Sequence, residues 1–323
     1  MMNVRRLGSA ELIQILEVHG PTHDADWMLP GVSHAALEGN VDWLTPEYYM
    51  PRTNRLVFSF QLWILKAGAN TIVIDTGIGN CKHRPTPWQN MMNTPALEWF
   101  YAVGVPPESI THVVHTHLHG DHVGWNTRLV DGRWEPTFPN AQHCMPAIDW
   151  CACKSRYDAG EHDLYGGSVA DSVIPIVEAG LARFIHPGEE IADCLTVLPA
   201  PGHTPGHVLF SFHDGGEDAV FTGDVLHSPV QILDPALNSR WCEFPDDARS
   251  SRRRLLHDAA RDGITIFRAR TNARRLARIS GARRLRARAL ARTLTAGPIE
   301  HLDARREELP DQQADRTRRG ADP

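Results

Sequence analysis

The residues from 117 to 122 carry four side chains that can bind a metal ion: His117, His119, Asp121 and His122. Side chains at positions i and i+2 point the same way only in extended or loop backbone, whereas a zinc-binding helix spaces two His residues at i and i+4. The spacing therefore predicts a ligand loop after a strand over 110–114. The first two His residues can share one metal ion. The Asp and the last His lie further round the turn and can reach a second ion.

Two later turns complete the set of candidate ligands. Each follows a short apolar run, as a strand end would, and each presents one ligand-type side chain: His203 within 201–207 and Asp224 within 222–224. His203 can supply a third nitrogen to the first metal, and Asp224 a carboxylate that bridges both. Three protein ligands plus a water are typical of a catalytic zinc site rather than a structural one. Three further His residues are expected to be non-ligands, with the last supporting its own turn: His112, His115 and His207.

The ligand order resembles that of the metallo-β-lactamase superfamily, and Asp75-Thr76-Gly77, after a strand expected over 71–74, resembles the early acidic turn of that family. The match runs from about residue 12 to residue 267. It implies an αββα sandwich, two mixed sheets between outer helices, whereas periodicity alone supports only an α/β class. Residues 223–235 resemble the branch that holds methyl parathion hydrolase and quorum-quenching lactonases. His227 stands where the lactonases usually carry Tyr, a pattern closer to the parathion hydrolase.

The resemblance implies two Zn²⁺ ions per chain and hydrolysis of an ester-like bond in a small molecule: a lactone, an aryl ester or an organophosphotriester. The nucleophile would be a metal-bound hydroxide, because zinc lowers the pKa of water toward about 7. Asp224 would bridge the ions and Asp121 would orient the nucleophile. His227 would line the pocket, act on the substrate, or only pack. Thioester or β-lactam hydrolysis is the alternative among enzymes.

One expected ligand is missing from the pattern. The family normally places a last His, which binds the second metal, just after the strand that corresponds to 264–267. Here residues 268–272 read Arg-Ala-Arg-Thr-Asn, and the only later His is His301. Because this ligand is missing, a hypothesis of a different class is that the chain is a degenerate metal-binding protein, which holds one metal ion and has little activity. Metal stoichiometry separates the two, since about two equivalents favour the enzyme.

The composition changes abruptly at residue 268. Residues 1–267 carry 18 Lys and Arg against 32 Asp and Glu, a net charge of −14, whereas residues 268–323 carry 15 Arg, no Lys and 7 acidic residues, a net charge of +8. This divides the chain into a hydrolase domain (1–267) and an Arg/Ala-rich tail (268–323). The tail is expected to be disordered, and its composition resembles an alternate reading frame of a GC-rich gene, which suggests a frameshift near codon 267. A genuine basic tail for a membrane surface or nucleic acid is the alternative.

Compartment and partners follow from what the chain lacks. No apolar run approaches the roughly 18 residues of a membrane span, and no apolar segment of signal-peptide length follows the basic N-terminus. We therefore expect a cytoplasmic protein without disulfides, which binds a small-molecule substrate, no membrane and no nucleic acid, and which can form a homodimer. Trp residues belong to the core by default. Three in loop-like segments are candidates for an apolar pocket wall: Trp27, Trp43 and Trp88.

Overall fold

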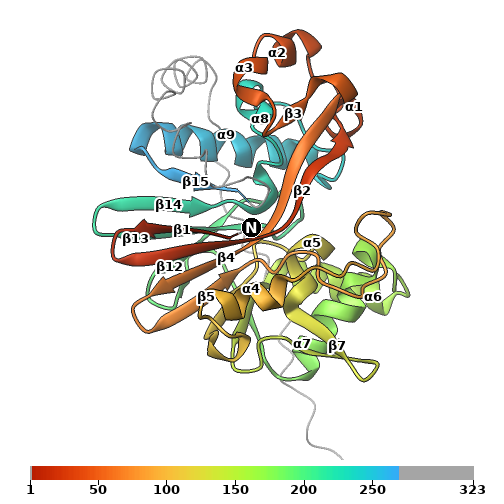
Figure 1. Ribbon diagram of the computed structural model, residues 1–323, viewed down its shortest axis with the longest axis vertical. Helices are drawn as coiled ribbons and strands as arrows, with labels where there is room; N and C mark the ends of the chain where they lie inside the picture. Colours follow the sequence, from red (N-terminus) through yellow and green to blue (C-terminus); the bar gives the residue numbers. More distant parts are fainter. Residues whose placement is uncertain (1, 269–323) are drawn as a thin grey trace, which may run out of the picture.

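The computed structural model describes residues 2–268 of the chain (Figure 1). Within these residues eight strands form the larger sheet: β1 (Met2–Leu7), β2 (Ala10–Asp24), β3 (Tyr49–Met50), β4 (Arg55–Ala67), β5 (Asn70–Ile74), β6 (His112–Val114), β9 (Gln142–Pro146) and β10 (Ala182–Ile185). Five strands form the smaller sheet: β11 (Glu190–Ile191), β12 (Leu195–Pro199), β13 (Val208–Asp214), β14 (Glu217–Phe221) and β15 (Thr265–Phe267). A separate hairpin consists of β7 (Thr127–Val130) and β8 (Arg133–Pro136).

The helices of the described residues are mostly short. The α-helices are α1 (Ala25–Met28), α2 (His34–Glu38), α3 (Val41–Leu44), α4 (Ala96–Ala102), α5 (Gly120–Val123), α6 (Ala147–Asp158), α7 (Ile174–Glu178), α8 (Val230–Leu233) and α9 (Pro245–Asp262). Single turns of other helix types are η1 (Pro51–Thr53), η2 (Pro107–Ser109), η3 (Gly124–Asn126), η4 (Leu164–Gly167), the π-helix η5 (Val169–Val173) and η6 (Gly223–Val225). Among residues 2–268, none of these helices has the length and apolar composition that crossing a bilayer requires.

The two sheets pack face to face, and strand β4 shows how. Its Trp63 and Leu65 lie in the apolar core between the sheets, while Leu62 and Ile64 point the other way, into the cluster that also contains Phe100 of α4. Alternation along a strand sends successive side chains to opposite faces. The alternation of residues over 56–65 predicts a half-buried strand. The strand is present, but both of its faces are covered and all ten residues are buried.

Helices cover both outer faces of the sandwich. In Figure 1 α9 lies on the side of the smaller sheet and α4, α6 and α7 on the side of the larger one. Leu255 and Leu256 of α9 pack against Leu209 and Val220 of the smaller sheet. Gly263 ends α9 in the left-handed region, at φ +75°, as its position after the last apolar residue predicts. The αββα sandwich implied by the resemblance is confirmed.

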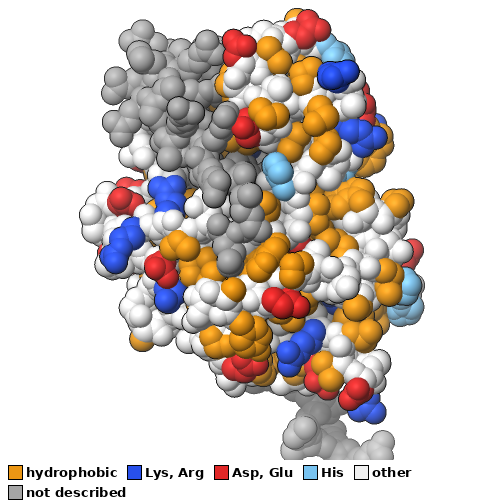
Figure 2. All heavy atoms as spheres, in the orientation of Figure 1, with side chains coloured by type: hydrophobic (Ala, Val, Ile, Leu, Met, Phe, Trp, Pro, Cys, Tyr) orange, Lys and Arg blue, Asp and Glu red, His pale blue; other side chains and the backbone are white. Residues whose placement is uncertain are grey.

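The Pro and Gly residues within 20–54 predict a long loop, and this prediction is wrong. Strand β2 continues to Asp24, paired with the start of β4, and α1, α2, α3 and β3 follow. These elements form a lobe at the top of Figure 1 with an apolar core of its own, which includes Leu37, Leu44 and Phe58. Figure 2 shows hydrophobic side chains over this lobe and over the lower part of the molecule, interspersed with acidic and basic ones. Strand β1, which the sequence did not predict, pairs with β2.

The proposed boundary at residue 267 coincides with the end of β15. The expectations for the tail, including disorder, a frameshift and a role for His301, fall on residues that lie outside the described part of the chain.

The loops that follow β5 and β6 are tied together by their backbones. The two strands are parallel neighbours, with Ile74 opposite Val114, so their carboxyl ends lie at the same edge of the sheet. Thr76 N donates to His122 O at 2.7 Å, and Gly124 N donates to Gly77 O at 2.8 Å. The buried carboxylate of Glu17 in β2 braces both loops. It accepts hydrogen bonds from the N–H groups of Ile78 and Gly79 and from the indole N–H of Trp125, at 2.7, 3.0 and 2.9 Å.

Because these loops touch, we expect Gly124→Ala to lower the free energy of unfolding by about 3 kcal/mol. A Cβ at this position would lie 1.9 Å from Ile78 O, a backbone atom that a rotamer change cannot move away. Gly20→Ala in β2 is the matched control, because its Cβ would meet nothing within 4 Å, and it should change stability by less than about 0.5 kcal/mol. Urea unfolding of both variants measures the difference, and equal stabilities would show that the loops separate easily.

Candidate metal centre

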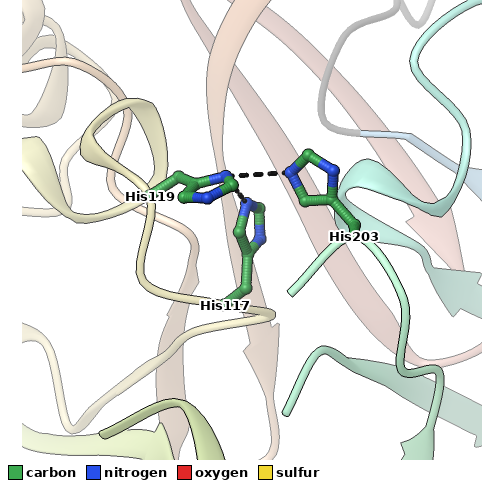
Figure 3. A group of neighbouring side chains, drawn as sticks. All are labelled: His117, His119 and His203. Atoms are coloured by element: carbon green, nitrogen blue, oxygen red, sulfur yellow. Dashed lines mark hydrogen bonds between the residues drawn. The ribbon is translucent and has the colours of Figure 1, made fainter. Parts of the chain in front are cut away.

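The candidate ligands come from strand ends of both sheets. His117 and His119 follow β6 of the larger sheet, whereas His203 lies between β12 and β13 of the smaller sheet and Asp224 follows β14. Asp121 and His122 lie on the single helical turn α5, rather than in the turn of a loop as expected. Figure 3 shows three of these side chains converging from the two sides of the site. The centre thus lies at one edge of the sandwich, where the sheets meet.

Three imidazole nitrogens converge on one point. His119 Nδ1 lies 3.1 Å from His117 Nε2 and 2.9 Å from His203 Nε2 (Figure 3). Nitrogen ligands bound at about 2.0–2.1 Å to one tetrahedral zinc ion are separated by roughly 3.3 Å, close to these distances, so the three atoms fit a single ion. Burial lowers the pKa of both His117 and His203 well below the usual value for histidine. Both rings are therefore neutral at pH 7, which is the form that binds a metal.

Asp224 is placed between two groups of ligands. Its Oδ2 lies 3.4 Å from His203 Nε2 and its Oδ1 lies 3.4 Å from His122 Nε2. Asp121 Oδ2 lies 3.7 Å from the same nitrogen of His122. Since each oxygen of Asp224 faces a different histidine, the carboxylate fits a position between two metal ions.

The surroundings of His122 are strongly negative. Burial lowers its pKa, but the carboxylates of Asp224, Asp121 and Asp75 outweigh burial and raise the pKa of His122 to about 10. Three carboxylates around one buried ring attract a cation, either a proton or a metal ion. This half of the centre therefore has the charge that a divalent metal requires.

Asp75 orients the ring of His122. Its Oδ2 accepts the Nδ1–H of His122 at 2.9 Å, and its Oδ1 accepts from Thr116 N at 2.8 Å. The bond at Nδ1 leaves Nε2 to face Asp224, an arrangement in which a carboxylate fixes the tautomer of a metal-binding histidine. Asp75 has φ of +51°, which Asp and Asn tolerate better than other non-glycine residues. The resemblance in the sequence identified this acidic turn but predicted no role for Asp75.

The turn that carries His203 is held between two helices. Asp149 of α6 accepts hydrogen bonds from Thr204 Oγ1 at 2.7 Å and from Gly206 N at 2.5 Å. On the other side Gly202, at φ +129°, approaches α9 so closely that a Cβ would lie 2.0 Å from Ala248 N. This contact explains why the turn needs glycine next to the candidate ligand.

The three histidines that were expected not to bind metal are His112, His115 and His207, and they make different contacts. His207 Nε2 accepts a hydrogen bond from Asp224 N at 3.1 Å, so the ring supports the Asp224 turn rather than its own. His115 Nδ1 contacts His122 O at 3.2 Å, beneath the centre. Neither these two residues nor His112 belongs to a group of convergent ligand atoms among the described residues.

His227 lies beside Asp224. It is completely buried, with Nε2 at 3.3 Å from Asp224 Oδ2. By contrast, the position after β15 offers no histidine among the described residues, since Arg268 follows Phe267 and residues 269–272 lie outside the described part. The guanidinium of Arg268 is buried and lies 5.7 Å from the centre of the Tyr48 ring.

No sequence pattern predicts the segment over 239–243, which contacts three of the histidines. Residues 239–243 contain Glu243, whose Oε1 lies 3.8 Å from His119 Nε2 and accepts the hydroxyl of Tyr165 at 2.6 Å. Cys242 Sγ lies 3.9 Å from His203 Nδ1. Ser239 Oγ lies 3.2 Å from His227 Nε2. A lone Ser, Cys or Glu in a loop has no recognisable pattern, so only the folded structure reveals these contacts.

A cavity of about 400 Å³ opens beside the centre. It is lined by Ile78, Arg84, Pro85, Thr86, Gln89, His119, Gly120, Asp121, Arg156, Tyr165, Gly166, Trp241 and Glu243. The three Trp residues proposed for the pocket wall do not line it. Trp27 instead contacts Trp241, with 5.8 Å between ring centres, and Trp43 packs near Tyr48 in the lobe. Trp241, which was expected in the core by default, lines the cavity together with Tyr165.

The comparison with protein families decides the wider assignment. The sequence pattern described as "Metallo-beta-lactamase superfamily" matches residues 59–269, which is more than half of the chain. The chain belongs to this superfamily. Members of the metallo-β-lactamase superfamily are generally metal-dependent, usually with zinc, and the His and Asp groups described above fit such a metal.

Relatives within the superfamily carry several names. An atrochrysone carboxyl ACP thioesterase of Passalora fulva is 26% identical over 190 residues, which cover 56% of this chain and 44% of the relative. A hydroxyacylglutathione hydrolase of a Synechococcus strain is 29% identical over 170 residues, covering 47% of this chain and 52% of the relative. The chain therefore spans about half the length of the curated relatives it matches.

Solved structures share the fold at low identity. The hydrolase AbOPH of the β-lactamase superfamily superposes with a TM-score of 0.68 at 21% identity, covering 84% of this chain and 90% of the other. AidC, described as a dizinc quorum-quenching lactonase, superposes with a TM-score of 0.64 at 20% identity, covering 83% and 90%. At such identities the similarity supports the fold alone.

We expect Asp75→Asn to weaken zinc binding by about 10- to 100-fold, because an amide cannot replace the carboxylate that holds the His122 ring. Asn tolerates the same left-handed backbone, so circular dichroism should be unchanged. The matched control is Asp193→Asn, an exposed Asp with φ of +55°. Competition with a chromogenic chelator measures the affinity, and equal zinc affinities for both variants would remove Asp75 from the support of the site.

Proposed function

We propose that this chain is a metal-dependent hydrolase that cleaves an ester-like bond in a small molecule: a lactone, an aryl ester or an organophosphotriester. The proposal is carried by Asp224, whose two oxygens face histidines of different ligand groups beside an open cavity. Two zinc ions held by such residues would make water nucleophilic at neutral pH and polarise the electrophile. We propose six protein ligands: His117, His119, Asp121, His122, His203 and Asp224.

The side chains around the cavity support a division of roles. Asp121 belongs both to the negative group around His122 and to the cavity lining, so its carboxylate can accept a hydrogen bond from the attacking water and orient it. Asp224 holds the two halves of the centre together. We place His227 at the reacting centre as well, because it contacts Asp224. Ile78 and Trp241 offer apolar surface to the acyl or aryl part of the substrate.

A cavity of about 400 Å³ accommodates a small molecule rather than a polymer. We propose residues 1–267 as the catalytic unit, since all of the proposed ligands lie within them.

Thioester hydrolysis is the second candidate, and one comparison favours it. A curated relative is named an ACP thioesterase. A thioester carbonyl presents the same planar electrophile to the site, so the ligand arrangement alone does not choose between oxygen and sulfur leaving groups. β-Lactam hydrolysis is a further alternative within the same chemistry.

A substrate panel tests the proposal. The zinc-loaded full chain should hydrolyse at least one of an acyl-homoserine lactone, an aryl acetate and a dialkyl aryl phosphate, and should do so faster than an acyl thioester or a chromogenic β-lactam. Removal of metal with a chelator should abolish the activity, and added zinc should restore it. His203→Ala should be inactive with any of these substrates, because it removes one of three nitrogens from the first ion.

Metal content completes the test. About two zinc equivalents together with hydrolysis support the enzyme. One equivalent or less, with no turnover of any panel member, would identify the chain as a degenerate metal-binding protein. Faster turnover of the thioester would instead select the second candidate.

A further inference from the structure

We propose that the cavity wall at Arg84 and Arg156 binds an anionic group of the substrate, a carboxylate or a similar oxyanion, away from the bond that the metal centre cleaves. The proposal rests on the proposed function and narrows it, because it names a class of ester-like substrate. Both arginines line the cavity of about 400 Å³, which His119 and Asp121 also line from the side of the metal centre.

Arg84 brings more positive charge to the cavity wall than its neighbours neutralise. Its Nη1 and Nη2 donate to the two oxygens of Asp171, at 2.7 and 3.0 Å. The same carboxylate also pairs with Lys82, whose Nζ lies 3.3 Å from Oδ1. Burial lowers the pKa of Lys82 to about 8, so its amine stays mostly protonated at pH 7. Two buried cations therefore share one carboxylate, and the net positive charge that remains favours an anion in the adjoining cavity.

The turn over 165–167 packs against Arg84 and holds Tyr165 at the same wall. Arg84 Nη1 donates to Gly166 O at 3.0 Å. A Cβ on Gly166 would lie 2.7 Å from Pro85 Cδ, so the two segments leave no room for a side chain there. Tyr165 has φ of +51°, a backbone conformation that bulky residues rarely adopt and that clusters at functional sites. The wall is therefore preorganised, which lowers the entropic cost of binding a ligand.

Arg156 of α6 extends this wall with a guanidinium that can bind a further partner. Its Nε and Nη2 both donate to Glu161 Oε2, at 3.0 and 2.6 Å, and residues 2–268 give its Nη1 no hydrogen-bond acceptor. The side chains of this pair are 42% and 48% exposed. An exposed ion pair contributes only about 0–1 kcal/mol, so Glu161 does not prevent a second carboxylate from binding the same guanidinium. The planar N–H fork of arginine matches the two oxygens of a carboxylate.

Tyr165 separates this guanidinium from the metal centre. Its ring centre lies 4.3 Å from that of His119 and 5.9 Å from the guanidinium carbon of Arg156. The carboxylates that line the cavity lie toward His119. Asp121 is a proposed metal ligand, and Glu243 Oε1, which accepts the hydroxyl of Tyr165, lies 3.8 Å from His119 Nε2. The cavity thus has an acidic end at the metal centre and a basic end one tyrosine ring away, which fits a substrate whose anion lies a few atoms from its ester group.

The rival explanation is that Arg156 serves only the helix that carries it. It lies in the last turn of α6, where a cation also offsets the helix dipole. Lys154 provides a matched control, since it lies on the same helix, is 43% exposed and pairs with Asp158, but does not line the cavity. Arg156→Gln and Lys154→Gln each remove one positive charge from α6, and only the first removes a hydrogen-bond donor from the cavity.

Binding of benzenesulfonate to the zinc-loaded full chain, measured by calorimetry, is the first readout. Methyl phenyl sulfone is an uncharged ligand of similar shape. The wild type and Lys154→Gln should bind the sulfonate at least about 10-fold more tightly than the sulfone, as one hydrogen-bonded ion pair predicts, whereas Arg156→Gln should reduce this ratio below about 3-fold. Equal affinities of the wild type for both ligands, or an equal loss in the two variants, would overturn the proposal. A preference that persists in Arg156→Gln would place the anion on the metal and overturn it as well.

Hydrolysis provides the second readout. The 4-nitrophenyl half-ester of adipic acid carries a carboxylate, whereas 4-nitrophenyl methyl adipate does not. Arg156→Gln should raise KM for the half-ester by about 10-fold with little change in kcat, because a contact remote from the reacting carbonyl stabilises the ground and transition states alike. The kcat/KM for the neutral diester should stay within about 2-fold of the wild type. An equal loss with both esters would show that Arg156 acts only on the structure.

The two readouts separate failure of this proposal from failure of the proposed function. Sulfonate binding needs no turnover, so a chain that hydrolyses no ester would refute the hydrolase, while the anion site would still be decided by the titration. Hydrolysis of both adipate esters with the same KM in the wild type and in Arg156→Gln would support the hydrolase and overturn the anion site.

Discussion

The buried carboxylate of Asp224 is the group on which the arrangement of the centre depends. Its side chain faces histidines of both sheets, and its backbone N–H donates to the ring of His207. A carboxylate removed from water costs several kcal/mol unless opposite charge compensates for it. Neutral His203 does not supply that charge, and His122 supplies it only while protonated. A bound cation would compensate for the carboxylate and explains why so polar a group lies at the edge of an apolar sandwich.

The candidate ligands that converge in the structure could be located from sequence because most of them lie within five residues of a strand end. His117, His119, His203 and Asp224 are fixed by local turns, and their spacing shows in a few residues of sequence. The fold class followed from the same motif through its resemblance to a family. What the structure adds at these positions is distance, for example the two 3.4 Å separations that place Asp224 between ligand groups.

The remaining features could not be predicted because they depend on contacts between distant segments. Glu243 reaches His119 across more than a hundred residues of sequence. The lobe over 20–54 contains Pro and Gly, which favour loops, yet pairing with β4 extends β2 to Asp24. Gln61 of β4 lies on the same face as Trp63 and is buried against the smaller sheet, where its Nε2 donates to Arg268 O at 2.9 Å, a contact that strand periodicity does not reveal.

The centre joins parts of the fold that are otherwise connected mainly by apolar packing. His117 and His119 follow a strand of the larger sheet, and His203 lies in a turn between two strands of the smaller one. A metal bound to all three is therefore a cross-link that exists only while the sheets are docked. By mass action, an ion present at about a thousand times its dissociation constant adds about 4 kcal/mol to the free energy of unfolding. The thermal midpoint of this protein should then depend on free metal concentration, and metal starvation in a cell would lower its abundance as well as its activity.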